Sequence, residues 1–302
     1  MEEWLFGWDA TPRIVSVWAS ADGRAIVWRR AQDGSLVREE ERFRPWILLS
    51  SRDDLRHPGA HALEVEELHG PGELRFLVSA DDGRTLARAV LDGATRRLGR
   101  RVGSLRDLPR EACLALAPED QYLTITGRVH FRDLVFDELR RAQIDLETTG
   151  LDPDVDRVFL AAIGRPDGDA ETLEIRSAIR DPDTAEADLI ERVLRRIAEL
   201  DPDVIENHNL HGFDLPFLAR RAELLGVRFA LGRVPSIPIG KRATARGARV
   251  ATADPAAHPM RRARFTVAGR ELIDTLDAVR RHDFSARDLP GHGLKVVAKH
   301  LG

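Results

Sequence analysis

The sequence predicts an α/β protein, α+β overall, built from two domains, and three observations support that prediction. The chain has 302 residues, a length that usually corresponds to about two domains. All five tryptophans lie in the first 46 residues, which sets that part apart in composition. Beyond residue 131, segments with strand character alternate with amphipathic helical segments. We therefore expect a β-rich α+β domain over residues 1–130 and a mixed-sheet domain over residues 131–302.

Composition restricts the class of protein. Hydrophobic residues make up 43% of the chain and charged residues 32%, which is typical of a soluble globular protein. No apolar run is long enough to span a membrane, and the start, Met1-Glu2-Glu3-Trp4, does not resemble a secretion signal. We expect a cytoplasmic protein without membrane contact. The single cysteine, Cys113, excludes an internal disulfide and a thiolate zinc site.

The N-terminal domain is predicted from its strand pattern. Arg13–Ser20 and Ala25–Arg30 are rich in β-branched and aromatic residues and flank a turn at Asp22-Gly23, which predicts an antiparallel meander. Leu74–Ser79 is a further strand, and Arg84–Leu98 has helical spacing. The tryptophans are interpreted as core residues, with stacking on nucleic-acid bases as the alternative.

The second domain shows a different order of elements. After a strand at Ile144–Thr148 come two more strands, a helix, a buried strand and a second helix. These later elements are, in order, Arg157–Gly164, Ala170–Arg176, a helix opened by a capping box of Asp183 and Glu186 and closed by Asp201-Pro202, Val204–Glu206, and a helix from Asp214 to Gly226. This order indicates a mixed sheet with helices packed on it, and the ribonuclease H-like arrangement is one such fold.

Two acidic residues stand out on the first strand of this domain. Because side chains of a strand alternate between its faces, Asp145 and Glu147 should share one face while Ile144 and Leu146 turn to the other. Two neighbouring carboxylates repel each other, and a divalent cation between them relieves that repulsion. The pair therefore predicts a metal site, with two solvated acids at a strand end as the alternative.

Asp214 is a third candidate carboxylate. It falls where a helix begins, with Pro216 in the first turn. An N-cap role would explain an aspartate there without any metal, since Asp is a favoured N-cap residue. Taken alone, Asp214 fits the N-cap role better, and its combination with the earlier acidic strand is what favours a metal ligand.

The order of these residues resembles a known family. Asp145-Leu146-Glu147, followed by Asn209-Leu210-His211-Gly212-Phe213-Asp214, is similar to the first two exonuclease motifs of the family B DNA polymerases, Asp-x-Glu and Asn-x-x-x-Phe-Asp. The stretches 269–276 and 293–302 are similar to the family's sequence leading towards its third motif. The specific resemblance covers residues 131–302, and the size and β-rich character of the N-terminal part are also similar.

The resemblance implies a 3′-to-5′ exonuclease, the proofreading activity, on a ribonuclease H-like sheet with two Mg²⁺ or Mn²⁺ ions. It implies that Asp145 bridges both ions, that Glu147 holds the ion carrying the attacking water, and that Asp214 binds the other ion. It assigns the terminal nucleotides of the substrate to four further side chains: Thr148, Leu151, Asn209 and Phe213. The implied partners are a single-stranded 3′ end of DNA, a primer-template, and a polymerase domain C-terminal to this chain.

The third motif of the family, Tyr-x-x-x-Asp, is missing from the sequence. The one tyrosine, Tyr122, lies upstream of the first motif. Phe284-Ser285-Ala286-Arg287-Asp288 has the spacing with Phe in place of Tyr, but the Pro290-Gly291 that follows predicts a loop. We therefore expect the exonuclease domain to be incomplete at its C-terminus, in a fragment or a truncated polymerase-like protein.

A basic stretch lies between the second motif and the expected third. Nine Lys or Arg fall between Leu231 and Arg270, against one acid, Asp254. Such a stretch would neutralise DNA phosphates, and it also fits a mobile, solvated loop; we expect both, a loop that is disordered without DNA and engaged with it. The expected DNA-backbone contacts are Lys241, Arg242, Arg246, Arg249, Arg261 and Arg262.

Two other functions fit the same residues. One is a catalytically silent module that binds DNA or organises an assembly and keeps the exonuclease fold without the fourth carboxylate. The other is a phosphodiesterase for small nucleotides or RNA, which would not need the basic stretch. Shortening of a labelled strand from its 3′ end separates the exonuclease from the silent module.

Overall fold

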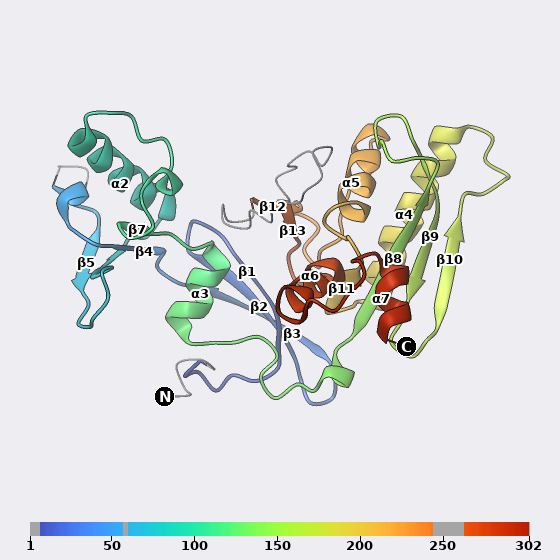
Figure 1. Ribbon diagram of the computed structural model, residues 1–302, viewed down its shortest axis with the longest axis horizontal. Coiled ribbons are helices and arrows are strands. Elements are labelled where there is room, and N and C mark those ends of the chain that lie inside the picture. The colour runs from blue at the N-terminus through green and yellow to red at the C-terminus, as the bar shows by residue number, and fades with distance from the viewer. Residues whose placement is uncertain (1–6, 57–59, 244–262, 302) are drawn as a thin grey trace. The chain divides into compact units, whose positions relative to one another are not determined.

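The computed structural model describes residues 7–56, 60–243 and 263–301. The chain divides into two compact units, residues 1–134 and 135–302 (Figure 1). Among the described residues, no helix combines the length and the apolar character needed to cross a membrane.

The described residues of the N-terminal unit form two antiparallel sheets and two α-helices. One sheet has the order β1-β2-β3 and the other the order β5-β6-β4-β7. The bounds are β1 Ile14–Ala19, β2 Arg24–Arg30, β3 Leu36–Arg42, β4 Trp46–Leu49, β5 Glu64–Glu67, β6 Phe76–Ser79, α2 Gly83–Leu98, β7 Cys113–Leu114 and α3 Pro118–Thr126. The strands and the helix predicted for this part are confirmed.

The tryptophans of this unit do not all behave alike. Trp28 and Trp46 are buried, and the indole N–H of Trp46 donates to the carbonyl of Gln121 at 3.1 Å. Trp8 is 66% exposed, and Trp4 lies outside the described residues. The core interpretation is therefore confirmed for Trp28 and Trp46.

The second unit is built on a five-stranded sheet of order β10-β9-β8-β11-β14. Strand β8 pairs antiparallel with β9 and parallel with β11, so the sheet is mixed, as predicted. A separate two-stranded pair is formed by β12 and β13. The bounds are β8 Arg141–Thr148, β9 Val158–Gly164, β10 Ala170–Glu174, α4 Pro182–Leu200, β11 Val204–Asn207, α5 Asp214–Leu224, β12 Gly240–Ala243, β13 Ala263–Thr266, β14 Glu271–Asp274, α6 Thr275–Ala286 and α7 Leu294–Leu301.

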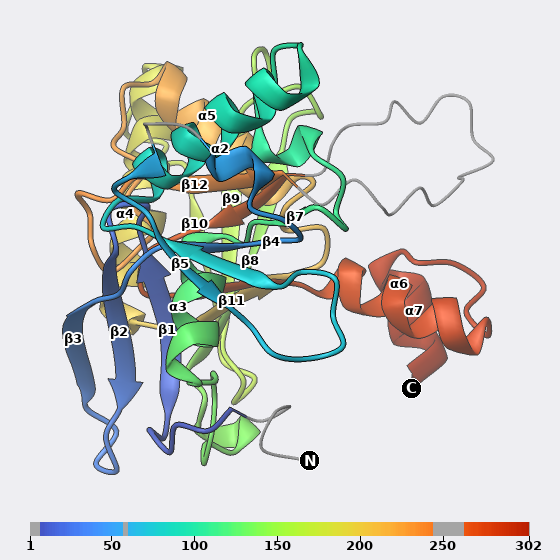
Figure 2. The same ribbon diagram turned by 90° about the vertical axis from the view of Figure 1, so that its left-hand side faces the viewer.

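Helices lie on both sides of this sheet (Figure 2). Helices α4 and α5 pack against one face, where Ile144 and Leu146 of β8 join Leu189 of α4 and Leu218 of α5 in a single core. Helices α6 and α7 lie side by side on the opposite side of the sheet. The residues of β8 that alternate with this buried set, Asp145 and Glu147 among them, are exposed.

Two local predictions are wrong, the capping box of α4 and the loop at Phe284, and the alternative role of Asp214 as an N-cap is also not found. The N-cap of α4 is Asp181, whose carboxylate accepts the backbone N–H of Thr184, so the predicted capping box of Asp183 and Glu186 does not form. Phe213 occupies the N-cap position of α5, so Asp214 is the first helical residue and not the cap. Phe284 lies in the last turn of α6 and not in a loop.

Glu186 forms a buried ion pair and does not take part in a capping box. Its side chain is 1% exposed and accepts two hydrogen bonds from Arg221 of α5, at 2.8 and 2.6 Å. Glu186 also accepts the backbone N–H of Val158, and Arg221 donates to the carbonyl of Pro153 at 3.2 Å. Helix α5 is thereby fixed to α4, to β9 and to the loop after β8.

Replacing Arg221 with Met should lower the free energy of unfolding by about 3 kcal/mol, because the buried carboxylate of Glu186 loses its bidentate partner. Replacing the adjacent Arg220 with Met should cost less than about 1 kcal/mol, since its partners Asp154 and Glu223 are 60% and 70% exposed. Urea unfolding followed by circular dichroism measures both values. Equal losses in the two variants would contradict a structural role of the buried pair.

Candidate functional site

Strand β8 places Asp145 and Glu147 on one face of the sheet. Ile144 and Leu146 are buried at 2% and 6% exposure, whereas Asp145 and Glu147 are both exposed. The predicted alternation is therefore confirmed. On the neighbouring strand β9, Ala162 is the register partner of Asp145.

Asp214 brings a third carboxylate to this edge from the start of α5. It is 4% exposed, and hydrogen bonding from the side chain of Asn207 and the backbone of Leu146 acts to lower its pKa. Burial, and then the charge of Asp145, raise the pKa of Asp214 from 3.8 to about 7. A buried carboxyl group therefore lies beside an exposed carboxylate, and their charges interact.

Asn207, the last residue of β11, was not predicted as a site residue. Its Nδ2 donates to Oδ1 of Asp145 at 3.2 Å, and hydrogen bonding from its side chain also acts to lower the pKa of Asp214. Its position follows from the parallel pairing of β11 with β8, because the carboxyl ends of parallel strands meet at one edge of a sheet. The sequence reveals the strand but not its neighbours.

Asp274, the last residue of β14, was also missed. It lies beside Asn207 in the parallel register of β11 and β14. Its buried carboxylate accepts the backbone N–H groups of Asn209, His211 and Leu276, at 2.9, 3.0 and 3.0 Å. Asp274 thus caps α6 and holds the loop that leads from β11 to Asp214.

The four predicted nucleotide-contacting residues differ in their availability. Leu151 is 83% exposed, and Thr148 donates its hydroxyl hydrogen to the carbonyl of Gly150 at 2.6 Å. Asn209 adopts a left-handed backbone conformation with φ of 74°. Phe213 is partly buried and packs against Phe217, with 5.3 Å between ring centroids. Leu151 is therefore the most accessible apolar contact of the four.

Two histidines attach the loop after β11 to neighbouring elements. His208 donates from Nε2 to the carbonyl of His292 at 2.7 Å, and its Nδ1 lies 3.2 Å from the hydroxyl of Thr275. His211 is buried, accepts the backbone N–H of Phe265 at Nδ1 and stacks on that ring. Burial lowers the pKa of His211, which favours the neutral imidazole that this hydrogen bond requires.

The basic stretch is only partly available to a ligand. Contrary to expectation, Arg233 and Arg270 are not in a solvated loop: their side chains are 5% and 3% exposed and pair with Asp201. Burial lowers the pKa of Arg270 to about 10, but this guanidinium stays charged at neutral pH. Lys241 lies over the ring of Phe265, with 5.4 Å to its centroid. The side chains of Arg242, Arg246, Arg249, Arg261 and Arg262 lie outside the described residues.

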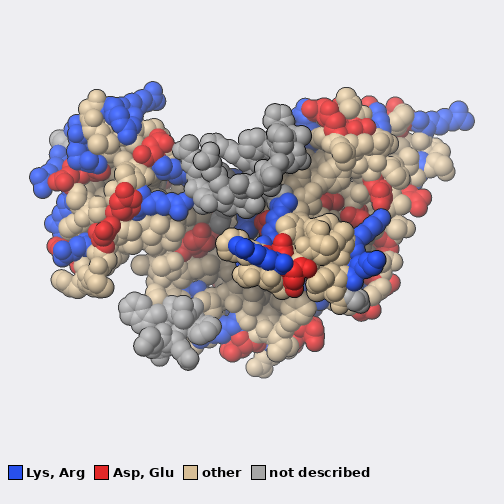
Figure 3. Space-filling view, viewed as in Figure 1, with Lys and Arg blue, Asp and Glu red and all other residues tan. Residues whose placement is uncertain are grey.

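Charges are mixed on the surface that the structure describes. On the face in Figure 3, the described Lys and Arg side chains are interspersed with Asp and Glu. Arg264, at the base of the basic stretch, pairs with Asp277 at 3.1 Å. The described part of the stretch therefore presents few cations without acidic neighbours.

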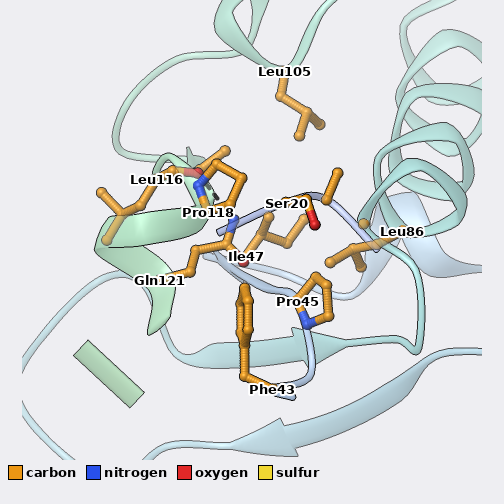
Figure 4. Close-up of a pocket in the computed structure, with 12 residues that line it drawn as sticks. Ser20, Phe43, Pro45, Ile47, Leu86, Leu105, Leu116, Pro118 and Gln121 are labelled. Carbon is orange, nitrogen blue, oxygen red and sulfur yellow. Dashed lines mark hydrogen bonds between the residues drawn. The ribbon is translucent and has the colours of Figure 1, made fainter. Parts of the chain in front are cut away.

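The N-terminal unit contains a cavity of about 180 Å³ (Figure 4). Phe43, Pro45 and Leu86 lie around it, and no ionisable side chain is among the residues that line it. The cavity therefore offers no group for acid-base chemistry or metal binding.

The carboxylate site has the donor type that Mg²⁺ and Mn²⁺ prefer, because its ligating atoms are carboxylate oxygens. Asp145 and Asp214 also repel each other, and a cation would relieve that repulsion. Within the part of the chain that the structure describes, no group of three or more His, Cys, Asp or Glu side chains is gathered closely enough to hold a metal ion. The structure thus brings Asp145 and Asp214 together and leaves Glu147 outside such a group.

Residues 169–295 match the family model described as the exonuclease domain of DNA polymerase family B. DNA polymerase 2 of Aeropyrum pernix is 29% identical over 152 residues, which cover 50% of this chain and 15% of that protein. The DNA polymerase of Pyrococcus glycovorans is 49% identical over 55 residues, or 18% of this chain and 7% of that protein. The chain therefore spans only a small part of the length of these relatives.

The fold is also similar to a solved structure, that of the family B DNA polymerase from Pyrobaculum calidifontis. The match has a TM-score of 0.59 and 19% sequence identity, and it covers 93% of this chain and 41% of that one. The similarity in fold thus includes both units of the chain.

Replacing Asp214 with Asn should stabilise the protein in EDTA at pH 8. The folded state holds the Asp214 proton more tightly than the unfolded chain, so ionisation of this group removes stability as the pH rises from about 4 to about 7. The amide carries no such charge, and the gain should be on the order of 2–4 kcal/mol at pH 8 and shrink towards pH 4.

Urea unfolding at both pH values measures this gain. Glu191→Gln, the same type of change on the exposed face of α4, is the control and should stay within about 0.5 kcal/mol of the wild type. A loss of stability in Asp214→Asn at pH 8 would contradict the assigned environment.

Proposed function

We propose that this chain, which carries the exonuclease domain of the family B DNA polymerases, removes nucleotides from the 3′ end of single-stranded DNA. The observation that supports this proposal most strongly is the convergence of Asp145 and Asp214 from a strand and a helix that are distant in sequence. An enzyme that hydrolyses phosphodiesters needs to stabilise the negative charge that develops on the reacting phosphate. Carboxylates that hold divalent metal ions make this possible.

Three residues would hold the divalent metal ions that such domains typically use: Asp145, Glu147 and Asp214. Bound metal ions would supply an activated water and stabilise the leaving 3′ oxygen. Asp145 and Asp214 would bind a cation between them, since their carboxyl groups already lie close enough to repel each other. Glu147 is on the same face of β8 and exposed, so its side chain is free to turn towards a cation that binds there.

The loop after β8 would contact the terminal nucleotides. Leu151 extends into solvent and offers an apolar surface to a base. Asn209 would add polar contacts from a backbone that Asp274 holds in place, and Thr148 and Phe213 would shape the floor of the site. The exposed cation Lys241 and the basic residues that follow it would contact phosphates of the strand.

The reaction would take place within a DNA polymerase. In a DNA polymerase, removal of a mispaired 3′ nucleotide is proofreading, and a polymerase domain in the same protein would use the corrected end. We therefore include a primer-template as the substrate of the whole protein.

Full-length chain with Mn²⁺ should shorten a 5′-labelled single-stranded oligonucleotide to a ladder of products, and a 3′-labelled one should release labelled mononucleotide first. Asp145→Ala should lower the rate by on the order of 100-fold or more, because losing even an outer partner of a metal ligand costs 10–100-fold. Glu191→Ala, on the exposed face of α4, should keep the wild-type rate. DNA binding without any shortening would contradict the proposal.

A further inference from the structure

The amide of Asn207 lies between two carboxylates that belong to different elements. Nδ2 of Asn207 is 3.2 Å from Oδ1 of Asp145 on β8, and the same side chain lies close enough to Asp214 on α5 to lower the pKa of that carboxyl group by hydrogen bonding. A primary amide has two N–H bonds, so one Asn side chain can serve one carboxylate with each. A hydrogen bond to a charged acceptor is also stronger than one between neutral groups.

The backbone of Asn207 is held by the neighbouring strand β14. Strand β11 pairs in parallel with β8 as far as Glu206, and with β14 through Asn207 itself, which lies beside Asp274. The carboxylate of Asp274 then accepts the backbone N–H groups of Asn209 and His211, just after Asn207. A side chain on such a rigid element can fix the groups it bonds to.

Gln143, on the same face of β8, does not have this role. Gln143, two residues before Asp145 on β8, donates to Glu206 at 3.3 Å. Glu206 also pairs with Arg141 at 3.0 Å. These three residues form a separate group at the start of β8, which makes Gln143 a matched control for Asn207.

We propose that Asn207 is a positioning residue whose amide holds Asp145 and Asp214 side by side, in the orientation in which they bind a divalent cation. This inference rests on the proposed function, in which these two carboxylates are metal ligands. Partners that orient the ligands of a metal ion typically change its affinity by 10–100-fold when they are removed. Asn207 would act by reducing the reorientation that the carboxylates need when a cation arrives.

The test is the affinity of the full chain for Mn²⁺ without DNA, measured by titration calorimetry. Asn207→Ala should weaken Mn²⁺ binding by about 10-fold or more, while Gln143→Ala keeps the wild-type affinity. In the nuclease assay, the Mn²⁺ concentration for half-maximal rate should rise by a similar factor and the rate should recover at high Mn²⁺. Wild-type affinity in Asn207→Ala, or an equal loss in Gln143→Ala, would overturn the proposal.

A second measurement requires no change at Asn207. In metal-free protein, the side-chain NH₂ signals of Asn207 should shift in NMR spectra of both Asp145→Ala and Asp214→Ala. Signals that move in neither variant would overturn the bridge. If the wild type binds Mn²⁺ but degrades no DNA, the proposed function fails while the affinity ratio still decides the role of Asn207; if it binds no Mn²⁺, both fall together.

Discussion

The second unit depends on one electrostatic constraint: a buried carboxyl group, Asp214, must lie next to a second carboxylate, Asp145. Burial alone raises the free energy of a charged Asp214, and the neighbouring charge raises it further. Such an arrangement persists only when surrounding structure fixes both groups. Contacts from the sheet, from α5 and from the loop after β11 hold Asp145 and Asp214 in place.

Each carboxylate is fixed by a different set of contacts. Asp145 is fixed by the sheet, since β8 is the central strand and is paired on both sides. Asp214 is fixed by α5, which Arg221 ties to Glu186 on α4, and by the loop that Asp274 holds. The resulting site combines rigid support with an exposed face, and this combination suits a group that must bind cations and a DNA end.

Local patterns in the sequence predicted several strands and helices, among them β8, β11, α4 and α5, and the shared face of Asp145 and Glu147, because alternation and amphipathic spacing depend only on nearby residues. Long-range pairing decided the rest. Asn207 and Asp274 join the site through parallel strand neighbours, which no local pattern reveals. Glu186 has the spacing of a capping box, but its carboxylate accepts hydrogen bonds from Arg221, which is distant in sequence. Likewise, the number of Lys and Arg residues between Leu231 and Arg270 does not indicate that Arg233 and Arg270 are buried.

The most direct test of the central claim is a double-mutant cycle on the metal-free protein at pH 8, with Asp145→Asn and Asp214→Asn alone and together. If the two carboxyl groups repel each other in the folded state, each single change should stabilise the protein and the double variant should gain less than the sum. The expected coupling is about 1 kcal/mol and should vanish near pH 4, where Asp214 is protonated. Additive effects within about 0.3 kcal/mol at pH 8 would contradict the account.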